Sequence, residues 1–457
     1  MMMRLFLGFH LLVPVLWLTG CDSNARPNIL LITLDTTRAD RLGCYGYPKP
    51  TSPHIDELAG EGIRFDFAIA QASVTPVSHA SILTGLYPFQ HGLRVIHGAS
   101  SFRLKEGAHP TVATLLKEQG WKTAAFVSAF PVSEYFGLHF GFDTFDNGIQ
   151  GNVEDKMKIT ETGQAVYALE KNQRRADETT DKALRWLEKN EGQDSFFMWV
   201  HYFDPHDQRI KPPRDFCAPF LKDSEPGDSE KRSIYDAEVA FMDQQIGRIF
   251  DCLKAEDRFD DTLILITNDH GQGLGDHDWW NHRILYQEQI HMPLVMRLPG
   301  GPAGRVIPDL VRSIDIMPTL LEFAGVPVPR VEGKSLLGLI RGEPEPERIA
   351  YADALIRLDD NRPTREEFTE EGKYNDLMYC VMTRSWKLIH RYFHPEASEL
   401  YRIDQDLQER ENVIDQYPEK RDELFQFLER PGVMIEKLIP ASEENEATQR
   451  LRELGYN

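Results

Sequence analysis

Four residues in this sequence could together activate a hydroxyl group against an ester. Asp35 follows an apolar run near the N-terminus, and Asp269 and His270 follow another apolar run far downstream. Thr75 stands at the start of a short helical pattern. Two carboxylates, an imidazole and a hydroxyl can bind a divalent cation, which lowers the pKa of the hydroxyl and makes it a nucleophile. The pattern therefore indicates attack on a phosphorus or sulfur ester.

Thr75 is placed for this chemistry by the helix that it begins. Gly85 can end that helix in a left-handed conformation, so the expected helix is short. Unpaired N–H groups and the helix dipole favour an anion at a helix N-terminus. A Thr at such a position is also a common cap with no catalytic role. The acids at Asp35 and Asp269 favour the catalytic interpretation, because all three elements then serve one cation.

The two acids are positioned by the strands that precede them. Residues 28–34 and 262–267 are continuous apolar runs, which are typical of strands buried on both faces. Asp35 and Asp269 follow their C-terminal ends, and ligands of open parallel sheets bind at that edge. Strand and helix patterns alternate through residues 26–343, the expected catalytic domain. This alternation predicts an α/β fold, a doubly wound mixed but mostly parallel sheet flanked by helices.

The remainder, residues 344–457, is expected to form a smaller C-terminal α+β subdomain. Residues 380–393 and 399–403 have the pattern of short antiparallel strands. The charged stretch 357–375 is predicted to be a surface loop, and the acidic tail 442–454 is predicted to be helical. The subdomain is therefore expected to contain a small antiparallel sheet and a helical tail.

The N-terminus has the features of an export signal. A positive residue precedes the apolar run 5–18, which is too short and too broken for a good membrane span. The segment ends in Leu-Thr-Gly-Cys21, which resembles a bacterial lipobox. We therefore predict that residues 1–20 are a lipoprotein signal peptide and that Cys21 carries the lipid anchor. The expected product is a cell-envelope lipoprotein facing the periplasm or the extracellular side; an ordinary cleaved signal is the alternative.

Composition narrows the class of partner. Hydrophobic residues make up 41% and aromatic residues 10% of the chain, values typical of a folded globular protein. Asp and Glu outnumber Lys and Arg by 72 to 51, so the formal charge is −21. No basic block stands out, and we expect no nucleic-acid partner. An anionic substrate must instead be held by local groups at the site.

Several of these segments resemble the sulfatase family of the alkaline phosphatase superfamily. The most specific signals are the helix that ends in Thr-Gly, and Asp-His-Gly followed by Leu-Gly-Asp-His. On these motifs the chain is identified as a member of that family. The matching stretches are residues 28–38, 51–65, 75–92, 202–206, 267–293 and 315–325.

The resemblance implies a metal site and a nucleophile. It makes Asp35, Asp269 and His270 metal ligands, and it makes Thr75 both a ligand and the nucleophile. One metal ion is expected, because relatives with two metals carry an Asp where this chain has Tyr202. The ligands suit a divalent ion, and Ca, Mn, Zn and Mg all stay open.

Further residues are assigned to the substrate by the same resemblance. His206, in Asp-Pro-His, matches the family residue that contacts substrate or leaving group. His282 stands where sulfatases place a substrate-binding Lys, and with His206 it is assigned to catalysis. His79, Arg38 and His201 are assigned to substrate binding.

The chain also departs from the family pattern at the centre of the site. Thr75 replaces the Cys that sulfatases oxidise to formylglycine, so no formylglycine is expected here. His79 replaces the family's Arg, and Thr36 replaces the second Asp of the usual pair. The stretch 127–130 lacks the family's Lys and His.

These departures shift the expected chemistry towards phosphorus. A sulfated Thr must be released by attack of water at sulfur, which is slow, whereas Thr serves well in phosphoryl transfer. We expect a metal-dependent hydrolase of sulfate or phosphate esters with a Thr nucleophile. Its substrate would be a small-molecule, glycan or lipid anionic ester. A phosphoglycerol- or phosphoethanolamine-type transferase and a non-catalytic sulfatase-like surface binding protein are the alternatives.

Overall fold

A computed structural model describes most of the chain. Eleven segments are left out of that description, and they include the expected signal peptide with Cys21, the loop 357–375 and the tail 442–454. Those predictions therefore lie outside the described residues. The described residues are 26–94, 103–148, 157–159, 165–167, 173–190, 195–206, 211–222, 224, 227–355 and 376–435.

An eight-stranded sheet forms the centre of the molecule, in the order β10-β2-β9-β8-β1-β7-β3-β4. Only β9 runs antiparallel to its neighbours, so the sheet is mixed and mostly parallel, as predicted. Its strands are β1 (Asn28–Leu34), β2 (Ile63–Ile69), β3 (Lys122–Val127), β4 (Thr144–Asp146), β7 (Phe196–Tyr202), β8 (Thr262–Asn268), β9 (His291–Arg297) and β10 (Arg305–Arg312). A separate pair is formed by β5 (Met157–Ile159) and β6 (Ala165–Tyr167).

Strand β1 lies in the middle of the sheet, between β7 and β8, and all of its residues are buried. Leu34 at its end pairs with Asn268 of β8 and with Tyr202 of β7, and all three strands are parallel. The segments that follow these strands therefore leave the sheet at one level on one edge. This register places the chemistry-bearing residues of separate segments side by side.

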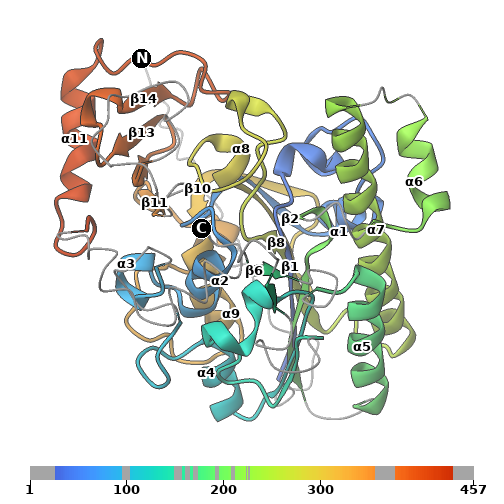
Figure 1. Ribbon diagram of the computed structural model, residues 1–457. Helices are drawn as coiled ribbons and strands as arrows, with labels where there is room; N and C mark the ends of the chain where they lie inside the picture. The colour runs from blue at the N-terminus through green and yellow to red at the C-terminus, as the bar shows by residue number, and fades with distance from the viewer. Residues whose placement is uncertain are drawn as a thin grey trace, which may run out of the picture.

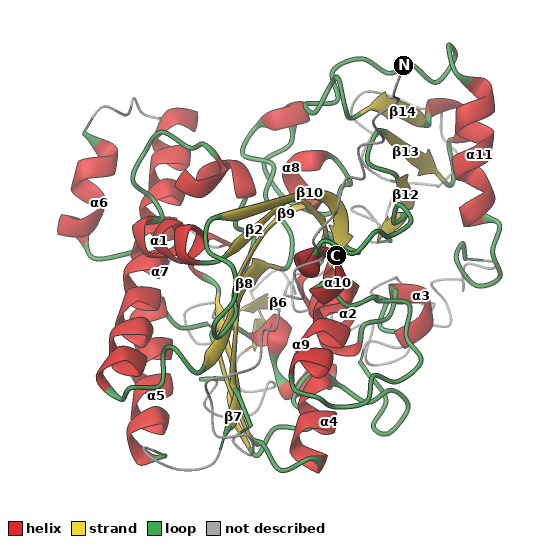
Figure 2. Cartoon of the chain, turned by 180° about the vertical axis from the view of Figure 1, so that it is seen from behind, coloured by secondary structure: helices red, strands yellow, loops and turns green. Residues whose placement is uncertain are grey.

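Helices cover both faces of the sheet, which explains why its central strands are apolar throughout (Figures 1 and 2). One face is covered by α1 (Pro53–Glu61), α5 (Ala176–Lys189) and α7 (Asp228–Ala255), and α6 (Arg214–Leu221) packs on the outer side of α7. The other is covered by α2 (Thr75–Thr84), α4 (Val112–Glu118) and α9 (Ile316–Phe323). Short helices are α3 (Pro88–His91), α8 (Gln287–Ile290) and α10 (Leu337–Arg341).

Single 3-10 turns complete the loops around the sheet. Two of them lie at the edge where β7 and β8 end, and these are η7 (Asp204–His206) and η8 (Asp276–Asp278). The others are η1 (Ala39–Arg41), η2 (Gly43–Tyr45), η3 (Phe130–Val132), η4 (Glu134–Phe136), η9 (Ser313–Asp315) and η10 (Pro395–Ala397).

A small antiparallel sheet follows α10 and confirms the predicted C-terminal antiparallel sheet. It contains β11 (Ala350–Ala354), β12 (Met378–Met382), β13 (Trp386–Arg391) and β14 (Glu399–Arg402), and α11 (Pro418–Leu428) packs against it. Its inner side chains, including Ala352 and Ile389, belong to the same buried cluster as those of the large sheet. The two sheets therefore share a core. Within the described residues, no helix combines the length and apolarity that crossing a membrane requires.

Candidate active site

The helix α2 carries Thr75 as its first residue. The preceding Val74 is extended, and Pro76 follows at the position where a missing N–H costs the helix nothing. All of the helix is buried, and the Thr75 residue is only 2% exposed. At the other end Gly85 adopts φ +67° and donates its N–H to the carbonyl of Ser81 at 2.9 Å, as the sequence predicts.

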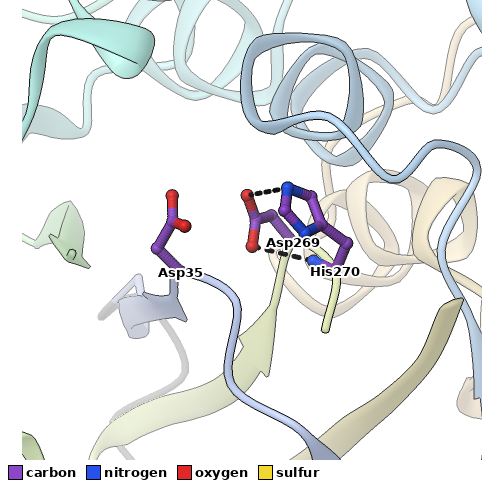
Figure 3. Close-up of side chains that lie close together, drawn as sticks. All are labelled: Asp35, Asp269 and His270. Atoms are coloured by element: carbon purple, nitrogen blue, oxygen red, sulfur yellow. Dashed lines mark hydrogen bonds and ion pairs between the residues drawn. The ribbon is translucent and has the colours of Figure 1, made fainter. Parts of the chain in front are cut away.

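Asp35, Asp269 and His270 meet at the edge of the sheet where β1 and β8 end (Figure 3). One ligand atom from each residue lies within 4.8 Å of the others. Thr75 Oγ1 lies 3.3 Å from His270 Nε2, so the hydroxyl adjoins the same group. The structure thus brings together the four residues whose types suggested the chemistry.

This group fits a divalent cation. Oδ1 of Asp35 and Oδ2 of Asp269 are buried and accept no hydrogen bond. Burial and the neighbouring charge of Asp269 raise the pKa of Asp35 well above its usual value. His270 donates Nδ1–H to the carbonyl of Gly271 at 3.0 Å, which leaves the Nε2 lone pair facing Thr75. A cation would compensate both carboxylates and accept that lone pair.

Asp269 also organises the backbone around it. Its Oδ1 accepts the N–H of Thr36 at 3.1 Å and the N–H of His270 at 2.7 Å. Thr36 occupies the place of the family's second Asp and has φ +49°, a left-handed conformation that is unusual for a β-branched residue. Its hydroxyl is buried without a hydrogen bond. One carboxylate therefore sets the turn that follows β1 and also faces the cation position.

His201 lies behind Asp35. Its Nε2 is 3.3 Å from Asp35 Oδ2, while its Nδ1 accepts the N–H of Ser128 at 3.4 Å. Because Nδ1 accepts, Nε2 carries the proton and donates to Asp35. Burial lowers the pKa of His201, in agreement with a neutral ring. Both nitrogens contact protein groups, which favours a role in orienting Asp35 over the predicted contact with substrate.

His79 is engaged in the same way. Its Nδ1 donates to the carbonyl of Thr75 at 2.8 Å, and its Nε2 accepts from the Thr33 hydroxyl at 3.1 Å. That hydroxyl in turn accepts the indole N–H of Trp199 at 2.9 Å. Burial lowers the pKa of His79, so the ring is neutral and fixed by this chain of bonds. The geometry favours orientation of the nucleophile segment over the predicted substrate contact.

Arg38 points away from this group, towards the loop that follows β8. Its guanidinium pairs with Asp40 and with Asp276, each at 2.6 Å, and donates to the carbonyl of Gly273 at 3.0 Å. The Arg38 side chain is 7% exposed. These bonds favour a structural role for Arg38, and its assignment to substrate binding stays a prediction.

His206 and His282 face one another beside the site. Their Nε2 atoms lie 3.2 Å apart, and His282 donates Nδ1–H to the carbonyl of Ser73 at 3.0 Å. The ring centroid of His282 is 4.7 Å from that of His270. Burial and the charges of His270 and His206 lower the pKa of His282 well below its usual value. At 3.2 Å the two Nε2 atoms can share one proton, the property needed by a group that protonates a leaving oxygen.

Sequence reasoning missed two residues that hold the site. Tyr235 looked like an apolar position of α7, yet its hydroxyl accepts the N–H of Arg38 at 2.8 Å and donates to the carbonyl of Thr36 at 2.7 Å. Ser78 on α2 donates its hydroxyl to the carbonyl of Asp269 at 2.7 Å. Neither contact leaves a signal in a single sequence, because each joins segments that are far apart along the chain.

Comparisons with known proteins identify the family of the chain. The family model described as Sulfatase matches residues 27–326, and the model described as N-sulphoglucosamine sulphohydrolase, C-terminal, matches residues 275–430. The N-acetylglucosamine-6-O-sulfatase of Bacteroides thetaiotaomicron is 26% identical, over 89% of this chain and 86% of the relative. The arylsulfatase of Clostridium perfringens is 24% identical, over 88% of this chain and 94% of the relative.

Solved structures show the same fold. A protein bound to its substrate D-glucosamine-2-N,6-O-disulfate superposes with a TM-score of 0.72 at 24% identity, over 88% of this chain and 97% of that chain. The phosphonate monoester hydrolase of Agrobacterium radiobacter gives a TM-score of 0.64 at 23% identity, over 88% and 95%. With the family model covering most of the large sheet and its helices, the chain is a hydrolase that belongs to the sulfatase family.

Proposed function

We propose that this hydrolase cleaves sulfate or phosphate esters with Thr75 as its nucleophile, and that it prefers phosphorus. One observation carries the proposal. The Thr75 hydroxyl begins a buried helix and lies 3.3 Å from Nε2 of His270, beside Asp35 and Asp269. A hydroxyl in that position can attack a tetrahedral oxyanion held at the helix N-terminus.

The residues that would hold a metal ion are Asp35, Asp269 and His270, with the Thr75 oxygen as a further ligand. When bound there, a divalent ion would neutralise the oxyanion of the substrate and lower the pKa of the hydroxyl. His201 would keep Asp35 oriented, because it donates to the carboxylate from a fixed tautomer.

The reaction then divides into two balanced steps. Thr75 Oγ1 gives its proton to solvent water and attacks phosphorus, and the bond from phosphorus to the leaving oxygen breaks. The pair His206 and His282 supplies the proton that the leaving alcohol takes. In the second step water attacks phosphorus and gives one proton to the pair His206 and His282, the bond from phosphorus to Thr75 breaks, and Thr75 takes a proton from solvent as phosphate leaves.

The preference for phosphorus rests on the second step. A sulfated Thr75 has no second hydroxyl with which to expel sulfate, whereas phosphothreonine can be released by attack at phosphorus. Solved phosphonate monoester hydrolases share the fold, which is consistent with this chemistry on the same scaffold.

A sulfated sugar is the second candidate substrate. It is favoured by the curated relatives, which include an N-acetylglucosamine-6-O-sulfatase and an N-acetylgalactosamine-6-O-sulfatase. In this chain the reaction would have to proceed without formylglycine, because Thr75 stands at that position.

The test compares the wild type with Thr75→Ser and Thr75→Ala on nitrophenyl phosphate, phosphonate, phosphodiester and sulfate, in buffers supplied with each candidate metal. The wild type is expected to turn over a phosphorus ester, Thr75→Ser to retain part of that activity, and Thr75→Ala to lose at least about 10³-fold. Mass spectrometry of quenched reactions should find one phosphoryl group on Thr75.

The same panel separates the alternatives. Thr75-dependent turnover of the sulfate alone would reverse the preference for phosphorus. Phosphoryl transfer to an added sugar or glycerol, faster than to water, would indicate a transferase. If the wild type shows neither turnover nor bound metal, the remaining alternative is a non-catalytic binding protein.

We also propose that the protein is exported and anchored to the cell envelope by a lipid on Cys21. The lipobox-like segment that ends at Cys21 supports this proposal. Metabolic labelling with an alkyne fatty acid should label the wild type but not Cys21→Ala. A labelled Cys21→Ala protein, or a wild type that fractionates without membranes, would contradict the anchor.

A further inference from the structure

A cluster of side chains around His277, outside the catalytic group, joins the loop after β8 to the C-terminal subdomain. We call residues 271–286 the β8–β9 loop. His277 lies in this loop, next to a cavity of about 640 Å³ between the two sheets' loops. Its side chain is 21% exposed, so the ring can exchange protons with solvent. The backbone of His277 has φ +50°, a left-handed conformation that the surrounding contacts must hold in place.

The partners of His277 require a particular charge state. Nδ1 lies 3.0 Å from the Glu288 carboxylate, and Nε2 lies 3.4 Å from the backbone carbonyl of Glu409. Both partners accept hydrogen bonds, so both ring nitrogens must donate. An imidazole that donates from both nitrogens is an imidazolium. Although burial opposes the charge, the hydrogen bond and charge of Glu288, together with Glu409, raise the pKa of His277 above its ordinary value.

The ring is held from the side as well. It stacks on Tyr286, with centroids 3.9 Å apart and planes within 2° of parallel. The Tyr286 hydroxyl donates to the carboxylate of Glu399 on β14 at 3.0 Å. Glu409 accepts the N–H of Gln287 at 2.6 Å and pairs with the buried Lys387 of β13 at 2.5 Å. His277 is therefore linked to β14 through Tyr286 and to β13 through Glu409.

Hydrogen bonds within the loop connect the part that contains His277 to His282. The indole N–H of Trp279, two residues after His277, donates to the carbonyl of His282 at 2.9 Å. Within the loop, Gly273 donates its N–H to Asn281, and Gly275 donates its N–H to Trp279, both at 2.9 Å. The position of His282 therefore depends on a hydrogen-bonded loop, and the contacts of His277 hold that loop in place.

We propose that His277 is a positioning residue, a cationic clamp that ties the β8–β9 loop to the C-terminal subdomain and thereby holds His282 in the site. Its effect on catalysis rests on the proposed function, in which His282 serves the leaving group. The clamp binds while the ring is protonated. It loosens as the pH rises through the pKa of His277, because one of the two donors is then lost.

Charged residues from several elements surround the His277 ring. Glu288 of α8 and Glu409 of the loop after β14 face the ring, and Lys387 lies behind Glu409. Burial raises the pKa of Glu409 to about 7 against the opposing charge of Lys387. The other charged residues that line the cavity are Arg38, Asp40, Arg41, Asp276, His291 and Arg410.

The test compares the wild type with His277→Gln, which keeps a neutral donor, and with His109→Gln as a matched control. His109 lies in a loop before α4 and is partly buried. Histidine NMR should give a midpoint above 6.5 for the signal that His277→Gln removes. A midpoint at or below that value would overturn the clamp.

Amide exchange reports the loop without any substrate. The N–H groups of Gly273 and Gly275 should exchange about tenfold faster in His277→Gln than in the wild type near pH 6, and equally fast near pH 9. His109→Gln should match the wild type at both pH values. Equal exchange in wild type and His277→Gln near pH 6 would overturn the clamp even where Thr75-dependent turnover is found.

Kinetics then link the clamp to the site. The ratio of kcat/KM between wild type and His277→Gln should be about tenfold near pH 6 and approach one near pH 9. A ratio that stays constant with pH would overturn the positioning role. If exchange behaves as expected but no ester is turned over by the wild type, the proposed function has failed and the clamp stands.

Discussion

Nδ1 of His79 donates a hydrogen bond to the carbonyl oxygen of Thr75 across 2.8 Å, one helical turn back along α2. The residue that replaces the family's Arg therefore touches the backbone of the residue that replaces the family's Cys. The two departures from the sulfatase pattern are physically coupled: a neutral ring now fixes the segment that carries the hydroxyl.

This coupling predicts different outcomes for two substitutions of His79. His79→Asn places an amide nitrogen near Nδ1 and can still donate to Thr75, whereas His79→Gln reaches towards Thr33 and leaves the Thr75 carbonyl without that donor. Loss of a buried hydrogen bond should cost His79→Gln about 1 kcal/mol more than His79→Asn. Urea unfolding measures the difference, and kcat/KM should follow the same order. The reverse order would show that the Nε2 contact with Thr33 matters more.

The opposite order is expected at His201. Here Nε2 donates to Asp35, so His201→Gln should preserve metal binding better than His201→Asn. Removal of such an orienting donor should weaken metal binding about 10- to 100-fold. Calorimetric titration of metal-free protein with each candidate ion measures the effect. Equal affinity in all three proteins would mean that His201 does not orient a metal ligand.

Metal binding itself should stabilise the folded protein through Asp269. A divalent ion at about 100 times its Kd should add about 2.7 kcal/mol to the stability of the wild type. Asp269→Asn should lose most of this gain, whereas Asp260→Asn, at an exposed acid paired with Arg297, should keep it. Thermal unfolding with and without a chelator measures the gain. No shift of Tm in the wild type for any of the four candidate ions would contradict the metal site.

Tyr235→Phe should loosen the turn that carries Thr36 and Arg38. It removes one hydroxyl that satisfies two backbone groups, at an expected cost of about 1–3 kcal/mol. Tyr202→Phe is the matched control, because that hydroxyl pairs with Thr180 on α5 instead. Both variants should lose stability, but only Tyr235→Phe should weaken metal binding. A normal metal affinity in Tyr235→Phe would show that this turn does not position the metal ligands.

Asp243 should make stability depend on pH. Its buried carboxylate accepts the N–H groups of His54 and Ile55 at the start of α1, and burial raises its pKa from 3.8 to about 7. A carboxyl with a raised folded pKa contributes its full stability below the unfolded value and loses it as the pH rises through the folded pKa. Relative to Asp243→Asn, the wild type should therefore lose stability between pH 3.8 and about 7. A difference that does not change over this window would contradict the shift.

The strands that carry the acids could be predicted because their burial is complete. Residues 28–34 and 262–268 have no solvent face, so a continuous apolar run identified them and placed Asp35 and Asp269 at their ends. The edge strand β10 was not predicted, because only four of its eight residues are buried and its pattern is broken where the register to β2 shifts. The direction of β9 was also beyond the pattern, since apolar runs look alike in parallel and antiparallel strands.

Residue types identified the site, but their roles depended on contacts. A sequence can place His79 and His201 near the nucleophile, yet it cannot show which ring nitrogen carries the proton. That follows only from partners such as the N–H of Ser128 and the carbonyl of Thr75. The role of Tyr235 could not be predicted for a related reason. Its ring fits the apolar pattern of α7, while its hydroxyl donates to the carbonyl of Thr36 in a different segment.

The reversed direction of β9 has a consequence for how this scaffold can diversify. Because β8 and β9 are antiparallel neighbours, the segment between them leaves and re-enters the sheet at one edge, and it contains Asp269, His270 and His282. The outer part of such a segment can change in length without changing the strands on either side. Residues inserted into its outer part would leave the order of the strands unchanged, provided that these three residues and the contact with the C-terminal sheet are kept. An insertion there would change the surface around the site while Asp269, His270 and His282 stay in place.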